Sequence, residues 1–289
     1  MSFEALKKNA TFSGKNQVIG PVIVQIDGYP QPFIRQDIDD PLFDQASTCV
    51  TEKPSLEQQS VLKGIYSYYD ENNKDFFFNL IDEKLEKLCS YLNMDDAHVD
   101  QSSLRQLICF SALMTVDSLD TKLGLPQFIS PVSTIQRGTG TCGDFSEVFA
   151  LIFESMQRRY GLFPSVRVER LNTANEWNGS EAEGDHTWNL LLAPLKHAGG
   201  FFVIPIDTNG ADKYLTKKLK QHTVSEKDFD VLVPTRGDSS VLRVAVNPSH
   251  RSWKDVVMNT LAGGVVTPAV VNEVIRRNIQ RLVRERKSR

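Results

Sequence analysis

The sequence predicts an α+β protein in which helices pack on an antiparallel sheet. Apolar residues recur at three- and four-residue spacing between residues 55 and 123 and again after residue 142, which is the pattern of amphipathic helices. Apolar runs with strand character come later, at residues 165–171, 186–195 and 201–208. Because helices and strands are grouped along the chain instead of alternating strictly, an α+β arrangement is favoured.

The first part of the chain is expected to hold one strand and then helices. Residues 18–26 are rich in β-branched side chains and end at a Gly-Tyr-Pro turn, which indicates a strand. The acidic, proline-containing segment 37–54 predicts a loop. Three helices are then predicted, at residues 56–69, 76–92 and 103–119. Gly124 and Pro126 prevent the last of them from continuing.

A segment rich in glycine and short polar residues, 136–144, is expected to form a loop directly before the next helix. The apolar face of that helix recurs at helical spacing and comprises Phe145, Val148, Phe149, Ile152 and Met156. Gly161 is the expected C-terminal cap. Cys142 therefore lies at or beside the start of a helix.

The strands of the second half are expected to include a hairpin. A polar loop, residues 172–185, follows the strand at 165–171, and Gly199-Gly200 separates the two later runs. If residues 196–199 form the loop, His186 and Asp207 are diagonal neighbours on one face of the hairpin, whereas an odd-length loop would separate them. A further strand at 243–246 and a terminal helix from about residue 268 complete the predicted elements.

Composition narrows the class of protein. The chain has 289 residues, of which 40% are hydrophobic and 24% charged, as in ordinary globular proteins. Its net charge of −3 argues against a general nucleic-acid binder. No signal peptide and no run long enough to cross a bilayer is evident, so we expect a cytoplasmic protein. The four cysteines form no C-x-x-C pair and are expected to be reduced. We expect the protein to use no metal and no cofactor.

Three residues suggest nucleophilic chemistry. The N-terminus of a helix favours a thiolate at Cys142, His186 opens an apolar strand, and Asp207 ends the next one. A reactive cysteine needs a base and a group that orients that base. Each residue also has a structural interpretation: a packed thiol, a histidine at a strand edge, and an aspartate that caps the turn formed by residues 208–210.

Together these residues resemble the transglutaminase-like branch of the papain-type cysteine enzymes. Residues 140–144 match its Gly-x-Cys-x-Asp helix start, residues 186–189 its His-x-Trp-Asn strand, and residues 207–208 its Asp-Thr strand end. A glycine and a strand follow the cysteine helix at residues 160–168, as in the family. The resemblance covers about residues 100–215 and implies a transglutaminase-like core.

The resemblance implies acyl chemistry on a protein, peptide or carboxamide substrate, by a protease, a deamidase or a transglutaminase-type acyltransferase. Cys142 would attack the carbonyl, His186 would move the proton and Asp207 would fix the histidine tautomer. The candidates for oxyanion stabilisation or substrate binding are Gln136, Gly143 and Trp188. The absence of a calcium-site signature and of paired C-x-x-C motifs disfavours the animal-type transglutaminases and the zinc-bearing glycanases.

Other functions stay open. A catalytically silent protein-binding module could use the same fold, and Arg137-Gly138 before the cysteine suggests arylamine-type acetyl transfer. The glycines 138, 140 and 143 formally match a dinucleotide fingerprint, but residues 130–135 make a poor preceding strand and the expected acidic residue is missing.

The resemblance divides the chain into an extension at residues 1–100, a catalytic core at 101–235 and a C-terminal extension at 236–289. The last extension ends in a basic amphipathic helix. Such a helix contacts a partner or an anionic surface, or else packs on the body of the protein with its arginines in water.

Overall fold

The computed structural model describes residues 36–63, 65, 67–122, 130–170, 187–196 and 200–234. It also describes the backbone of strand residues 11–12, 18–19, 22–24, 33–35, 171–173 and 186. The strand expected at 243–246 and the basic helix expected from residue 268 lie outside the described residues.

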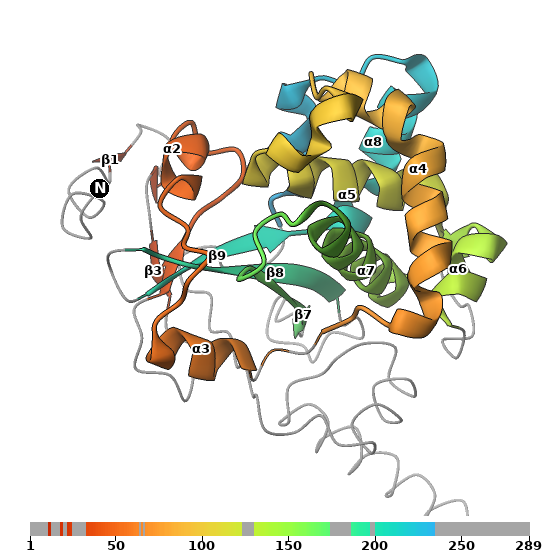
Figure 1. Ribbon diagram of the computed structural model, residues 1–289. Helices are drawn as coiled ribbons and strands as arrows, with labels where there is room; N and C mark the ends of the chain where they lie inside the picture. Colours follow the sequence, from red (N-terminus) through yellow and green to blue (C-terminus); the bar gives the residue numbers. More distant parts are fainter. Residues whose placement is uncertain are drawn as a thin grey trace, which may run out of the picture.

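A mixed sheet of five strands lies in the middle of the fold (Figure 1). Its spatial order is β3 (Val22–Val24), β4 (Phe33–Arg35), β9 (Phe201–Ile206), β8 (His186–Pro194) and β7 (Arg167–Thr173). All neighbouring pairs are antiparallel except β4 and β9, which are parallel. The expectation of a purely antiparallel sheet is therefore wrong at this pair. A parallel pair needs a long crossover, and here helices α2 to α7 lie between the two strands in the sequence.

Two short ladders lie apart from this sheet. Strand β1 (Thr11–Phe12) pairs with β2 (Val18–Ile19) in antiparallel fashion. Strand β5 (Asp120–Thr121) pairs with β6 (Thr139–Gly140) in parallel fashion. The expected strand at residues 18–26 is thus split between β2 and β3.

The helical elements account for most of the described chain. The α-helices are α2 (Phe43–Ser47), α3 (Leu56–Lys63), α4 (Lys74–Tyr91), α5 (Leu104–Ser118), α6 (Pro131–Arg137), α7 (Cys142–Tyr160) and α8 (Thr208–Gln221). Short 3₁₀ segments are η1 (Glu71–Asn73), η2 (Asp96–Gln101) and η3 (Glu226–Leu232). This mixture of helices and small sheets confirms the α+β class in general.

Each face of the sheet has its own apolar cluster. Alternate residues of β8 and β9, including Leu191, Ala193 and Ile204, join the large cluster that also contains α5 and α7. The intervening residues pack in a smaller cluster with Val61 and Leu62 of α3. Helices α5 and α7 therefore cover one face of the sheet and α3 the other (Figure 1).

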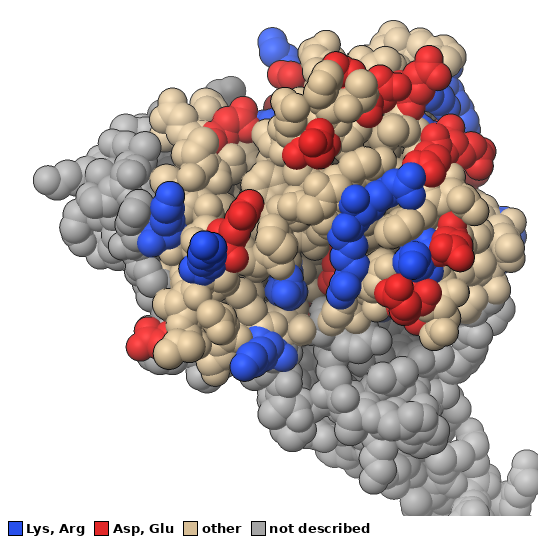
Figure 2. Space-filling model, viewed as in Figure 1, with Lys and Arg blue, Asp and Glu red and all other residues tan. Residues whose placement is uncertain are grey.

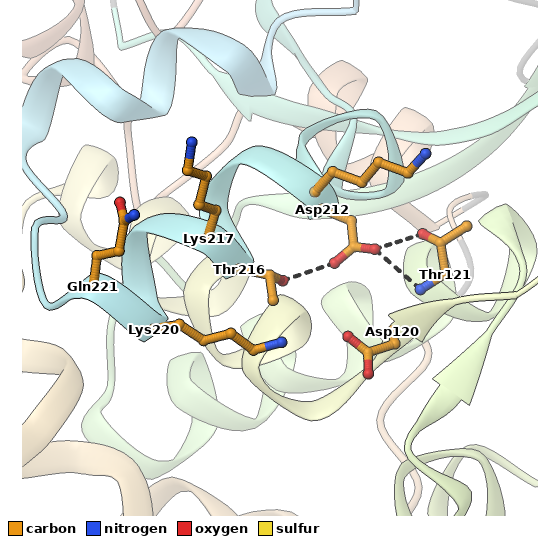
Figure 3. Close-up of a pocket in the computed structure, with 8 residues that line it drawn as sticks. Asp120, Thr121, Asp212, Thr216, Lys217, Lys220 and Gln221 are labelled. Atoms are coloured by element: carbon orange, nitrogen blue, oxygen red, sulfur yellow. Dashed lines mark hydrogen bonds between the residues drawn. The ribbon is translucent and has the colours of Figure 1, made fainter.

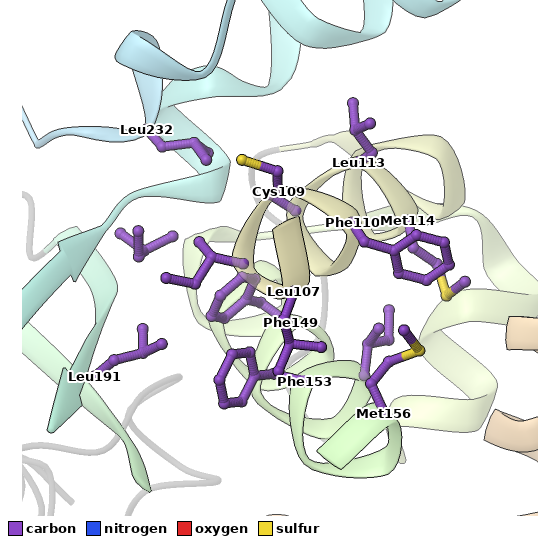
Figure 4. Close-up of a cluster of buried hydrophobic side chains, with 14 of the residues drawn as sticks. Leu107, Cys109, Phe110, Leu113, Met114, Phe149, Phe153, Met156, Leu191 and Leu232 are labelled. Atoms are coloured by element: carbon purple, nitrogen blue, oxygen red, sulfur yellow. The ribbon is translucent and has the colours of Figure 1, made fainter. Parts of the chain in front are cut away.

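The centre of the large cluster is the contact between α5 and α7 (Figure 4). Phe149 and Phe153 of α7 are fully buried, and their rings stack with centroids 6.1 Å apart. Helices α2 and α4 contribute Phe43 and Phe77 to the same cluster. The segment before residue 100 thus shares its apolar core with the segment after it.

Three helices occur where none was predicted. Helix α2 lies in the expected loop at 37–54 and buries Phe43 and Ala46. Helix α6 has Ser130 as N-cap, Pro131 at its first position and Gly138 in a left-handed C-cap at φ 69°. Helix α8 replaces the expected turn after Asp207, because its buried face can pack against the core through Ala211, Leu215 and Leu219.

Charges of both signs are interspersed over the described surface that Figure 2 shows, in keeping with the small formal net charge of −3. Within the described residues, no helix combines the length and the apolar character needed to cross a membrane.

Candidate functional site

Cys142 is the first residue of α7, as the sequence predicts, and its side chain is partly exposed. The helix begins here because Thr141 is extended and the Asp144 side chain reaches back to it. Asp144 Oδ2 accepts hydrogen bonds from the Thr141 backbone N–H at 2.8 Å and from the Thr141 hydroxyl at 3.1 Å. The acidic side chain in the first turn also complements the helix dipole.

The segment that leads to Cys142 is held on both sides. On one side β6 pairs with β5: Asp120 N–H donates to Gly138 O at 3.0 Å and Lys122 N–H to Gly140 O at 2.9 Å. On the other side the Arg137 guanidinium donates twice to Thr139 O, at 2.9 and 2.8 Å. The expected loop at 136–144 is therefore an ordered sequence of helix end, short strand and helix start.

A glycine is required at position 140, because the backbone there lies very close to Asp144 of α7. A Cβ atom at this position would lie 2.8 Å from Asp144 Cβ, which is closer than carbon atoms pack. Glycine thus permits the strand β6 to pass directly beside the first turn of α7.

Strand β8 is attached to the same turn of α7. Asn189 is fully buried, and its Nδ2 donates to Ser146 O at 3.0 Å. Ser146 lies one helical turn after Cys142, and Asn189 lies three residues after His186, the first residue of β8. The backbone of His186 pairs with Thr173 of β7, but its side chain lies outside the described residues.

Strand β9 brings Asp207 to the same end of the sheet. Leu195 N–H donates to Gly200 O at 2.8 Å, and Asn189 is opposite Ile206, so the predicted hairpin register is confirmed between residues 189–194 and 201–206. The ladder does not continue to His186 and Asp207, so their expected diagonal pairing within the hairpin does not form. The strand ends at Ile206, earlier than expected. Asp207 is buried and caps α8, with Oδ1 accepting from Gly210 N–H at 2.8 Å.

These contacts bring three separate segments together. Given the rise per residue of helices and strands, the backbones at Cys142, His186 and Asp207 each lie within about 10 Å of the Asn189–Ser146 hydrogen bond. A cysteine, a histidine and an aspartate thus begin or end their elements at one end of the fold. By alternation along β8, position 186 belongs to the face of Trp188 and position 189 to the α7 face, so a triad of these residues can form only around the end of the sheet.

The three other predicted site residues lie in different places. Gly143 is buried in the first turn of α7, next to Cys142. Gln136 is exposed in the last turn of α6 rather than in a loop. Trp188 is buried in the cluster with α3, on the face of the sheet away from α7. The structure therefore brings Gly143, but not Trp188, to the α7 face.

A charged pair that sequence patterns did not single out lies beside this site. Arg170 is opposite Asn189 in the sheet, is buried, and approaches Glu147 of α7 at 3.6 Å. Burial raises the pKa of Glu147, Arg170 lowers it and Asp144 raises it further. The one available sequence signal was that strand alternation puts Arg170 on the same face as Val168.

Two of the other three thiols, Cys89 and Cys109, are buried. Burial raises the pKa of Cys89 to about 12 and raises the pKa of Cys109 still further. Cys49 is partly exposed, and its Sγ lies 3.9 Å from Gln45 O. Among the described residues, no cluster of three or more histidines, cysteines or acidic residues could hold a metal ion.

Comparison with known proteins adds no relative: no family model, no curated protein and no solved structure matches this chain.

Proposed function

We propose that this protein performs cysteine-dependent acyl chemistry on a peptide or carboxamide substrate, on a transglutaminase-like core. The observation that carries the proposal is the Asn189–Ser146 hydrogen bond, which attaches the strand of His186 to the helix of Cys142. The confirmed register between Asn189 and Ile206 supports it, because this register brings Asp207 to the same end.

The proposed reaction has two steps. The Cys142 thiolate attacks the carbonyl carbon, the C–N bond breaks, and His186 gives its proton to the departing amine or ammonia. A thioester with Cys142 remains. His186 then takes a proton from water or from an acceptor amine, which attacks the thioester and releases an acid or a new amide and the free thiol.

The start of α7 suits both steps. The dipole of α7 favours negative charge at its N-terminus, where Cys142 and Gly143 lie, so it would stabilise the thiolate and then the oxyanion. Asp207 would orient His186. Its Oδ1 also accepts the bond from Gly210 N–H at 2.8 Å that caps α8.

Thiol labelling tests the proposal. At about pH 6, iodoacetamide should alkylate Cys142 at least ten-fold faster than Cys49, because a helix N-terminus and a histidine lower the pKa of a thiol. The sites are separated by peptide mass spectrometry, and a Cys49→Ser variant confirms the assignment. His186→Gln should remove this advantage. Equal rates at Cys142 and Cys49 would contradict the proposal and favour the silent binding module.

A second experiment separates hydrolysis from transfer. p-Nitrophenyl acetate serves as acyl donor, and the acetylated enzyme is detected by its intact mass. Decay of the thioester at the same rate with and without added amines indicates a hydrolase. Faster decay with formation of the amide indicates an acyltransferase, and Cys142→Ser should form no thioester in either case.

A further inference from the structure

A buried aspartate links α8 to the strand that precedes Cys142. Asp212 in α8 is 4% exposed and accepts three hydrogen bonds. Its Oδ2 accepts from Thr121 N–H at 3.0 Å and from the Thr121 hydroxyl at 2.7 Å, and its Oδ1 accepts from the Thr216 hydroxyl at 2.9 Å (Figure 3). The two bonds from Thr121 join residues 91 positions apart in the chain.

A second residue of α8 reinforces this link. Asn209 Nδ2 donates to the Thr121 hydroxyl oxygen at 2.8 Å. The Thr121 hydroxyl thus donates to Asp212 and accepts from Asn209, so both of its functions are used. Because Asn209 and Asp212 lie in the first turns of α8, they hold β5 close to the helix end that Asp207 caps.

Strand β5 in turn holds the approach to Cys142. Thr121 is opposite Gly140 in the β5–β6 ladder, and Lys122 N–H donates to Gly140 O at 2.9 Å. Gly140 is followed by Thr141, the N-cap of α7, and then by Cys142. A continuous path of hydrogen bonds and a few covalent links therefore runs from the helix of Asp207 to Cys142, separately from β8.

The link lies at the surface of the fold. Asp212, Thr121 and Thr216 form part of the lining of an open hollow of ≈ 440 Å³, beside Lys217 and Lys220 (Figure 3). None of these five residues belongs to the apolar core. Losing one hydroxyl here should leave the packing of α5 and α7 intact.

We propose that Thr121 and Asp212 are positioning residues, which hold the β6 segment against α8 and so fix Cys142 relative to Asp207. This inference rests on the proposed function, since it assigns a role in the same reaction. Displacing a reacting group by about 1 Å can cost on the order of 100-fold in rate, so a single directional bond can matter.

The test compares Thr121→Val with Thr121→Ser. Valine has nearly the same shape but lacks the hydroxyl, whereas serine retains it. With p-nitrophenyl acetate, Thr121→Val should lower the acylation rate at saturating donor about 10- to 100-fold, leave the half-saturating concentration unchanged, and move the pH midpoint upward. Thr121→Ser should retain the wild-type rate. The matched control Thr216→Val removes the third bond to Asp212 without touching β5, and it should change the rate less than three-fold.

Hydrogen exchange decides the question independently of activity. In Thr121→Val, the hydrogen-bonded amides of Lys122 and Thr141 should exchange faster, while amides in the centre of α7 keep their protection. Unchanged exchange at both places would overturn the proposal, even if wild-type Cys142 formed no thioester. Wild-type acylation kinetics in Thr121→Val would overturn it too, and so would equal impairment of the serine and valine variants.

Discussion

The first turn and the centre of α7 are held in different ways. The centre, from Phe145 to Met156, packs against α5 and the sheet in the apolar core. The first turn is fixed by a hydrogen bond that Asp144 accepts from Thr141 N–H, and one turn further on Asn189 donates a hydrogen bond to Ser146 O. Apolar packing contributes most of the stability and depends little on the orientation of the contacting groups. Hydrogen bonds contribute less stability but fix the relative orientation of the groups that they join. The comparison indicates that stability and reactivity can be changed separately within one helix.

The largest effect on stability is expected in the centre. Phe149→Ala removes a fully buried ring that stacks on Phe153, and it should lower the free energy of unfolding by about 3–5 kcal/mol. Urea denaturation measures this change. The control is Leu56→Ala, because Leu56 is 83% exposed and its loss should change stability by less than about 0.5 kcal/mol. A loss below about 1 kcal/mol for Phe149→Ala would contradict the assignment of the core.

A smaller effect on stability, with a larger one on reactivity, is expected beside the first turn. In Gly140→Ala the new methyl group would meet Asp144 Cβ at 2.8 Å, so β6 or Asp144 must move. We expect a loss of about 1–3 kcal/mol in stability together with slower alkylation of Cys142.

The control for this variant lies at the other end of the same helix. Gly161 caps α7 at φ 70° with no atom near its missing Cβ, so Gly161→Ala costs conformational strain only. Alkylation of Cys142 should then be unchanged. If both variants slowed alkylation equally, the first turn would not be a separate unit.

The smallest expected effect on stability concerns Glu154, a buried acidic residue in the centre of α7. Burial raises the pKa of Glu154, while hydrogen bonds to its Oε2 from the Ser67 hydroxyl at 2.7 Å and Tyr69 N–H at 2.8 Å partly offset the rise. Because the folded-state pKa is above the unfolded value of about 4.3, the folded protein gains stability as the pH falls through the folded-state pKa.

This pH dependence can be measured against Glu154→Gln. The difference in unfolding free energy, wild type minus variant, should increase as the pH is lowered from 8 toward 4.5. Urea denaturation at several pH values follows this difference. A difference that stayed constant or decreased would show that Glu154 is charged at no cost in the folded protein.

Local patterns predicted much of the fold. The apolar spacing predicted α4, α5 and α7 to within a few residues, and the length of the hairpin loop predicted the register of β8 and β9. Helix α6 was missed although Ser130, Pro131 and Gly138 are ordinary helix signals. The parallel pairing of β4 and β9 could not be predicted, because it depends on how the chain returns to the sheet after helices α2 to α7.

In the candidate site, too, some features could be predicted from the local sequence and others could not. The position of Cys142 at a helix start followed from nearby residues, and so did Asp207 as a possible cap. The partners that hold these segments, including Thr121 with Asp212 and Asn189 with Ser146, are 91 and 43 residues apart. Such pairs depend on tertiary packing and leave no periodic pattern in the sequence.

The parallel pair β4–β9 also has a consequence for biosynthesis. Phe33 pairs with Phe201, so an early segment of the nascent chain meets its partner only after 168 further residues have left the ribosome. Closing a loop of this length carries an entropic cost before any ladder bond forms, which makes folding slow. Until then the edge of β4 that pairs with β9 can accept other strands, and chaperones that cover such edges should raise the yield of this protein.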